Sequence, residues 1–149
     1  MSSTHSPGAE STAPLHERLL DLWAAPIPDP HEAQASFAML YSDPVTINGG
    51  EVPLSSLVAR ATQTHSSLER LGVEILDVIE APGKLVLAFQ MTARHVGAWH
   101  SALGDVPATG RTVSVRTIDV LTVHEGLITA IWVVSDEAAL LTELGAKLY

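Results

Sequence analysis

The sequence contains no cysteine among its 149 residues, so disulfide bonds and thiolate metal sites are excluded. Basic residues are also scarce: eight lysines and arginines stand against 17 aspartates and glutamates, for a formal net charge of −9. Nucleic acids and anionic membranes are bound through basic patches, so we expect neither partner. No apolar run approaches the roughly 20 residues of a membrane-spanning helix, and no secretory signal is visible. The expectation that remains is a cytoplasmic protein.

What is present is enough apolar material for one core. The chain is 46% hydrophobic and 17% charged, and its length is typical of one domain. Residues 1–13 are mostly Ser, Thr, Gly, Pro and Ala, which predicts a disordered N-terminal tail. We therefore expect a single domain over residues 14–149.

The first half of the chain predicts three helices. Apolar residues recur at helical spacing from Leu15 to Trp23. Asp29 can cap a second helix that has Pro30 in its first turn. A third helix is expected over about 54–68, and His65 falls on its apolar face.

The rest of the sequence is mostly strand and ends in one more helix. The segments with strand character are 45–47, 73–80, 85–96, 112–123 and 127–134. The 85–96 segment has an apolar row that runs from Leu85 to His95 and must face the helices. Residues 97–110 form a long loop, and a last helix is expected over 137–147, capped by Ser135 or Asp136. Helices followed by antiparallel strands indicate the α+β class.

Asp119 is the most informative polar residue, because the other residues of its strand row are mainly apolar. A carboxylate in such a row is costly unless it is paired or protonated. Desolvation would raise the pKa of Asp119, which suits a general acid or a hydrogen-bond donor to a carbonyl. The alternative is a structural ion pair, for example with an arginine.

The histidines and large side chains give weaker signals. His95 ends the apolar row and would reach Asp119 if their strands were adjacent, forming a proton-transferring pair. The alternative is that His95 lies at the rim of the pocket and is hydrogen-bonded to the backbone. His65 is more simply explained as a core residue than as a ligand. The seven histidines lack metal-ligand spacing, so we expect no metal. Trp99 lies in the 97–110 loop, for which a lid over a pocket is our preferred interpretation.

Three motifs carry a resemblance to a known family. They are Arg94-His95-Val96-Gly97, Glu125-Gly126-Leu127-Ile128, and Asp136 followed by Leu144-Gly145. Over about residues 15–145 the chain resembles SnoaL-like polyketide cyclases, a branch of the NTF2-like fold. The resemblance implies a curved, mainly antiparallel sheet wrapped around helices, with a deep apolar pocket that closes rings on polyketides without a cofactor. It also implies a homodimer through the outer sheet face, which includes Trp132.

The positions that are catalytic in the family's aldol cyclases differ here. The family's aspartate acid/base corresponds to Val133, its histidine to Asp119, and its glutamine to Thr117. We therefore expect Asp119 and His95 to carry the chemistry. The residues expected to bind substrate, from the resemblance and from their side chains, are Trp23, Tyr41, Asn48, His65, Met91, Trp99, Thr117 and Val133.

Loss of the family aspartate favours a closure that needs little proton transfer. A [4+2]-type carbocyclisation is one such reaction, and indane-forming members of the fold are the analogues. A second hypothesis is an aldol cyclase with Asp119 as base. Hydration or hydroxylation ranks lower, because paired carboxylates are not evident. The non-enzymatic alternative is a binding or dimerisation module, which would have a filled cone rather than a cavity.

Overall fold

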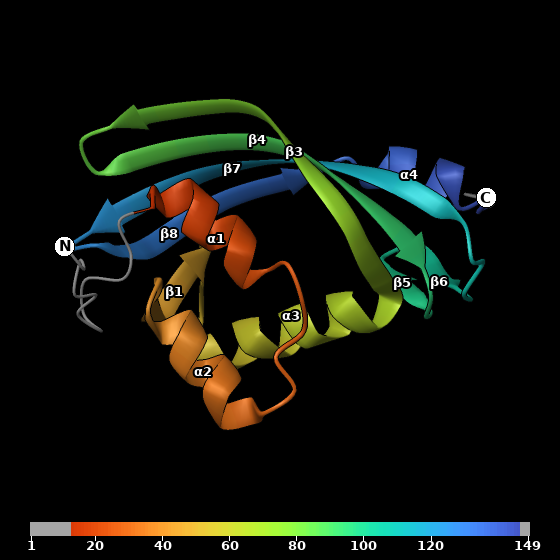
Figure 1. Cartoon of the computed structure of the whole chain (residues 1–149), viewed down its shortest axis with the longest axis horizontal. Helices are drawn as coiled ribbons and strands as arrows, with labels where there is room; N and C mark the ends of the chain where they lie inside the picture. The colour runs from red at the N-terminus through yellow and green to blue at the C-terminus, as the bar shows by residue number, and fades with distance from the viewer. Residues whose placement is uncertain (1–12, 147–149) are drawn as a thin grey trace, which may run out of the picture.

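The computed structural model describes residues 13–146 (Figure 1). Its helices are α1 (Leu15–Leu22), α2 (Pro30–Ala38), α3 (Leu54–Ser67) and α4 (Glu137–Glu143). Its strands are β1 (Tyr41–Ile47), β2 (Gly50–Val52), β3 (Leu68–Ala81), β4 (Lys84–His95), β5 (Trp99–Ser101), β6 (Gly104–Val106), β7 (Thr112–His124) and β8 (Leu127–Ser135). Nearly all of the predicted tail lies outside the described residues. The last helix, predicted to reach residue 147, ends at Glu143 instead, and Gly145 follows with a positive φ of 74°.

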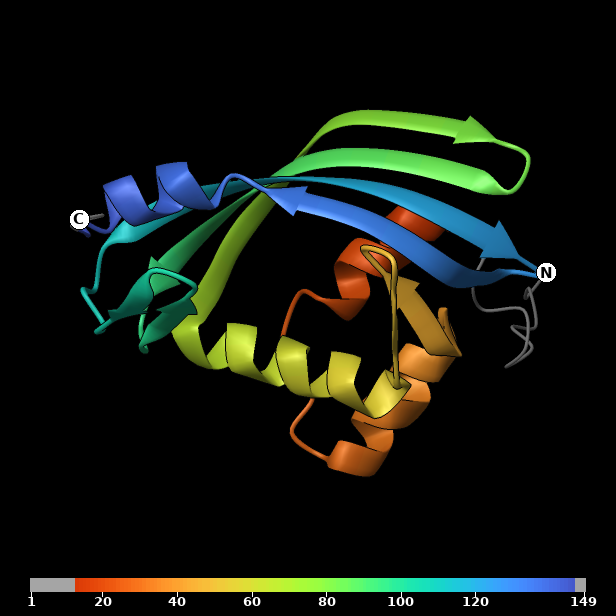
Figure 2. The ribbon, with the colours of Figure 1, turned by 180° about the vertical axis from the view of Figure 1, so that it is seen from behind.

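One curved sheet dominates the structure. Its six strands run in the order β2-β1-β8-β7-β4-β3, and every neighbouring pair is antiparallel except β1 and β8. Figures 1 and 2 show the long strands arching over α1 and α3, while α4 lies beyond the end of β8. The predicted α+β, NTF2-like architecture is confirmed.

The inner face of the sheet follows from strand periodicity. Along β4, the alternate residues Leu85, Leu87, Ala93 and His95 are buried against the helices, as their apolar row predicts. They continue across the sheet into β7, where Leu85 pairs with Leu121 and Ala93 pairs with Val113. The concave face is therefore the apolar face of the sheet.

Irregularities in the ladder accompany the curvature. The register of β3 against β4 shifts between Arg70 and Gly72 and again between Ile75 and Asp77. Such bulges insert an unpaired residue and bend the strand. The sheet consequently curls round the helices, and a space remains between its concave face and the helical layer.

Capping side chains mark the starts of two helices. The Asp29 carboxylate accepts a hydrogen bond from the His31 backbone at 3.0 Å, and the Asp136 carboxylate accepts one from Ala139 at 3.1 Å. Asp136 rather than Ser135 is thus the cap of α4.

Two expectations about extent need correction. Strand β1 begins at Tyr41 rather than at 45, because pairing with Ile128 of β8 extends it. The 97–110 segment is not simply a loop, since β5 and β6 pair within it as a short hairpin. Within the part of the chain that the structure describes, no helix is long and apolar enough to cross a membrane.

Candidate functional site

A cavity of about 320 Å³ lies between the concave face of the sheet and helices α1 and α3. Its volume is at the lower end of the range for small-molecule sites, roughly 300–1,000 Å³. Its walls are mostly aliphatic and aromatic. They include Leu19, Leu20, Leu57, Leu68, Val73, Phe89, Met91, Val115, Leu121, Ile131 and Val133. A cavity of this kind favours a mostly apolar ligand.

Seven of the ten predicted site residues line this cavity, although they come from five different strands and the residue that follows α1. They are Trp23, Tyr41, Met91, Trp99, Thr117, Asp119 and Val133. Alternation in β7 directs Thr117 and Asp119 to the same face as Val115 and Leu121. Trp99 of the β5–β6 hairpin reaches the cavity from outside the main sheet.

Asp119 is an unpaired carboxyl group inside this apolar wall. Its strand neighbours are Leu87 on β4 and Val133 on β8, neither of which offers a polar side chain. Among the described residues its carboxylate has no hydrogen-bond or ion-pair partner, so the alternative interpretation of Asp119 as part of a structural ion pair is wrong. Desolvation by burial raises the pKa of Asp119 from 3.8 to about 6. The group can therefore exchange a proton near neutral pH.

Trp23 and Tyr41 form a polar pair in the same wall. The Trp23 indole Nε1–H donates to the Tyr41 hydroxyl oxygen at 2.9 Å. Phe37 supports both rings, edge-on to Trp23 and stacked on Tyr41. Burial raises the pKa of Tyr41 above its ordinary value, and the charge of Asp119 raises it further. Tyr41 therefore keeps its proton, for which the described residues provide no acceptor.

His95 does not lie beside Asp119, and the expected His–Asp pair is wrong. The strands are adjacent, but Asp119 faces Leu87, and His95 lies eight residues further along β4. At about 3.3 Å per residue this separates them by roughly 25 Å along the strand. His95 is fully buried outside the cavity lining, and its Nδ1 accepts a hydrogen bond from the Thr109 backbone at 3.1 Å.

Asn48 and His65 also lie outside the lining. Asn48 has a positive φ of 49° in the β1–β2 turn, and its side-chain oxygen accepts from the Val133 backbone at 2.8 Å. It fastens this turn to β8. His65 is half-buried on α3, and desolvation, followed by the charge of Arg70, lowers its pKa.

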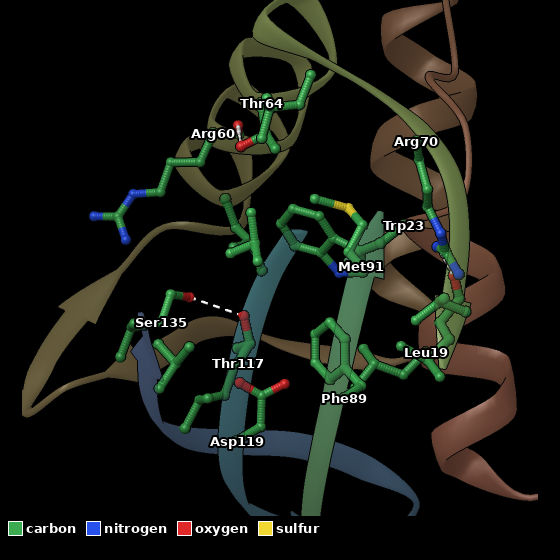
Figure 3. Close-up of a pocket in the computed structure, with 18 of the residues that line it drawn as sticks. Leu19, Trp23, Arg60, Thr64, Arg70, Phe89, Met91, Thr117, Asp119 and Ser135 are labelled. Atoms are coloured by element: carbon green, nitrogen blue, oxygen red, sulfur yellow. Dashed lines mark hydrogen bonds between the residues drawn. The ribbon is translucent and has the colours of Figure 1, made fainter. Parts of the chain in front are cut away.

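The sequence analysis missed several polar residues of the lining: Arg60, Thr64, Arg70 and Ser135. Ser135 lies within 2.9 Å of Thr117, hydroxyl to hydroxyl. Figure 3 shows Arg60 and Arg70 on opposite sides of the cavity, Thr64 above and Asp119 below. Helical spacing from Leu57 to Arg60 and Thr64 was a signal that could have found two of them. No such signal exists for Arg70, because the direction of its side chain depends on the bulge that follows it in β3.

Comparison with known proteins agrees with this architecture. TsrD from Streptomyces laurentii shares 22% identity over 89% of this chain and 93% of its own, with a TM-score of 0.72. A SnoaL-like polyketide cyclase from Agrobacterium tumefaciens shares 18% identity over 90% of this chain and 100% of its own, with a TM-score of 0.69. IdmH from Streptomyces antibioticus shares 16% identity over 95% of this chain and 100% of its own, with a TM-score of 0.68.

At these identities the solved structures establish the fold alone. No curated protein matches the chain. The model of the SnoaL-like polyketide cyclase family, however, matches residues 15–144, which is nearly all of the folded part. The chain belongs to the SnoaL-like polyketide cyclase family.

Proposed function

We propose that this protein closes a carbocyclic ring on a mostly apolar polyketide chain, in a [4+2]-type reaction that needs no cofactor. The observation that carries the proposal is the unpaired Asp119 carboxyl group in an otherwise apolar cavity wall. A purely structural carboxylate in this position would be expected to have a partner. A carboxyl group that binds a substrate oxygen would have no protein partner before the substrate binds.

Much of the acceleration would come from holding the chain in a folded, reactive conformation. Orienting two parts of one molecule saves the entropy that the free chain loses when it closes. Flat and branched side chains suit this task, and Trp23, Phe89, Met91 and Trp99 lie along the cavity. The cavity thus favours one folded shape of a flexible substrate.

Asp119 would assist this closure by hydrogen bonding. An apolar substrate that displaces water removes the remaining solvation of the carboxylate and raises its pKa further. The protonated group then donates to a carbonyl or hydroxyl of the chain. The Tyr41 hydroxyl, polarised by the Trp23 indole, can supply a second donor in the same wall.

The alternative reaction is an intramolecular aldol closure with Asp119 as base. Its raised pKa favours this role too, since a carboxylate with a pKa of about 6 is a stronger base than an ordinary one. The non-catalytic alternative, a binding module with a filled cone, lacks the cavity found here.

We also propose a homodimer through the outer face of the sheet. Apolar residues lie exposed there on neighbouring strands: Ile118 is 53% exposed, Trp132 60% and Val134 73%. The register places Ile118 opposite Val134 and Val120 opposite Trp132, so the residues form one surface. Sedimentation equilibrium of the wild type and of Trp132→Lys tests this, and a monomeric wild type would contradict it.

The experiment that tests the reaction is deletion of the gene in the organism that encodes it, followed by mass analysis of what accumulates. An open-chain compound with the mass of the cyclic product supports isomerising ring closure. A compound heavier by one water indicates dehydrative aldol closure. An unchanged metabolite profile contradicts a cyclase. Adding the purified protein back to the accumulated compound must form the ring.

A further inference from the structure

The charge of the cavity is opposite to the charge of the chain. The whole chain carries a formal charge of −9, yet the lining holds two arginines, Arg60 and Arg70, and one carboxyl group, Asp119. Figure 3 shows Arg60 and Arg70 on opposite sides of the cavity, with Asp119 below and between them. The cavity therefore has cationic groups in its lining, which an entirely apolar substrate would not require.

Arg70 is the arginine best placed to hold a ligand. It is half-buried in β3, and one of its N–H groups donates to the Leu20 carbonyl at 2.7 Å. This bond anchors the guanidinium, while its other donors have no acceptor within the described ranges. It forms no salt bridge there either, although the charge of Asp21 is felt at a distance. Burial without a bonded carboxylate lowers the pKa of Arg70.

The half-buried Arg70 guanidinium has N–H donors left to bind a ligand. Its planar fork fits a carboxylate through two parallel hydrogen bonds, which are stronger than bonds between neutral groups. The Thr64 hydroxyl also lies in the lining, but it donates to the Arg60 carbonyl at 3.0 Å, so binding of a carboxylate depends on Arg70. Asp119, when ionised, repels a carboxylate from the other end and thus fixes the orientation of a ligand.

We infer that the substrate is an amphipathic acid, whose carboxylate binds Arg70 at one end of the cavity while its apolar chain extends toward Asp119. Arg60 is exposed on the opposite side of the cavity and adds long-range attraction. The inference rests on the proposed function, because it names the substrate class of that cavity. It gives the enzyme a means of choosing which end of a flexible chain reaches the reacting position.

The test uses parinaric acid, a fluorescent polyene carboxylic acid, and its uncharged methyl ester as probes. Binding is measured at about pH 8, where the acid is ionised, for the wild type, Arg70→Gln and Arg94→Gln. Arg94 is exposed on the other face of β4 and serves as the matched control. We expect the wild type and the control to prefer the acid about tenfold, and Arg70→Gln to lose that preference.

Equal binding of acid and ester by the wild type would overturn the inference and leave the proposed cyclase intact. A preference that survives in Arg70→Gln would also overturn it. Failure of the wild type to bind either probe would count against the proposed function as well, since the cavity would then accept no polyene chain.

A second measurement on the wild type avoids reliance on a variant that loses the anchor to Leu20. Burial, and then the positive charge of Arg70, lower the pKa of His65, so this imidazole reports on its neighbour. A carboxylate bound to Arg70 offsets that charge. In an NMR titration, parinaric acid should raise the pKa of His65 and the methyl ester should not. An identical His65 titration with both probes would contradict the inference.

Discussion

Two regions of this protein place a titratable side chain on the concave side of the same sheet, and they do so in different ways. His95 is fully buried where β4 ends, and the Thr109 backbone and hydroxyl both contact its Nδ1, at 3.1 and 3.0 Å. Asp119 is half-buried in the middle of β7, faces a cavity and has no bonded partner among the described residues. The first arrangement serves the fold, and the second leaves a group available for a ligand.

The surroundings of His95 extend this contrast. Val96 and Gly97 donate backbone hydrogen bonds to the Ser67 carbonyl at 2.9 and 3.2 Å, which ties the end of β4 to the end of α3. A side chain at Gly97 would collide with the Ser66 carbonyl. The motif Arg94-His95-Val96-Gly97 thus closes a corner of the fold. A recurring sequence motif need not mark the chemistry.

The largest expected effect concerns how stability depends on pH at Asp119. The folded chain holds this proton more tightly than the unfolded chain, so the free energy of unfolding falls as pH rises from 3.8 to about 6. The loss is about 3 kcal/mol and persists at higher pH. Asp119→Asn should lack this pH-dependent loss. Urea denaturation of both proteins between about pH 4 and 7 measures the difference.

The control for that measurement is Asp77→Asn, which removes an exposed carboxylate on β3. If its stability difference from the wild type had the same pH slope, the effect could not be assigned to burial of Asp119.

Substitutions at His95 should lower the free energy of unfolding and leave the reaction rate nearly unchanged. His95→Leu leaves the Thr109 backbone N–H without its acceptor and should cost about 2 kcal/mol of unfolding free energy. His95→Asn keeps an acceptor near the position of Nδ1 and should cost less. Both folded proteins should turn over substrate at close to the wild-type rate. A rate that fell while stability held would contradict the structural role.

Asp119→Asn, in contrast, should lower the reaction rate. If the carboxyl group only donates a hydrogen bond to a pre-folded substrate, the rate should fall about tenfold. Turnover of the compound that accumulates in the gene deletion measures it. A loss of a hundredfold or more would instead support the aldol mechanism, with Asp119 as the base.

The smallest expected effect is at the neighbouring hydroxyl. Tyr41→Phe removes the acceptor of the Trp23 indole and the proposed second donor to substrate. We expect a loss of about 1 kcal/mol in stability and a few-fold decrease in kcat. The matched variant Trp23→Phe removes the indole N–H and reduces the ring, but it leaves the Tyr41 hydroxyl in place and should keep more of the rate than Tyr41→Phe. Equal kinetic losses in both variants would argue that packing, not the Tyr41 hydroxyl, matters.

Much of the fold could be predicted because it depends on local signals. Alternation identified the inner row of β4 and the placement of Asp119, and carboxylate caps marked the starts of α2 and α4. The site was predicted less completely. Asn48 suited a binding role by position, yet its side chain bonds the Val133 backbone. Arg70 gave no signal, since nothing near it in sequence shows which way a bulged strand turns.

The sequence by itself determined the class of the protein: which residues alternate inward, where helices begin, and that an aspartate lies in an apolar row. Periodicity and capping act over a few residues and can be read directly. Only the tertiary structure decided distances along and across the sheet. Register put Leu87, not His95, opposite Asp119, and bulges in β3 accompany the curvature that leaves room for a cavity. Register and curvature arise from pairing between distant segments, so no local pattern specifies them.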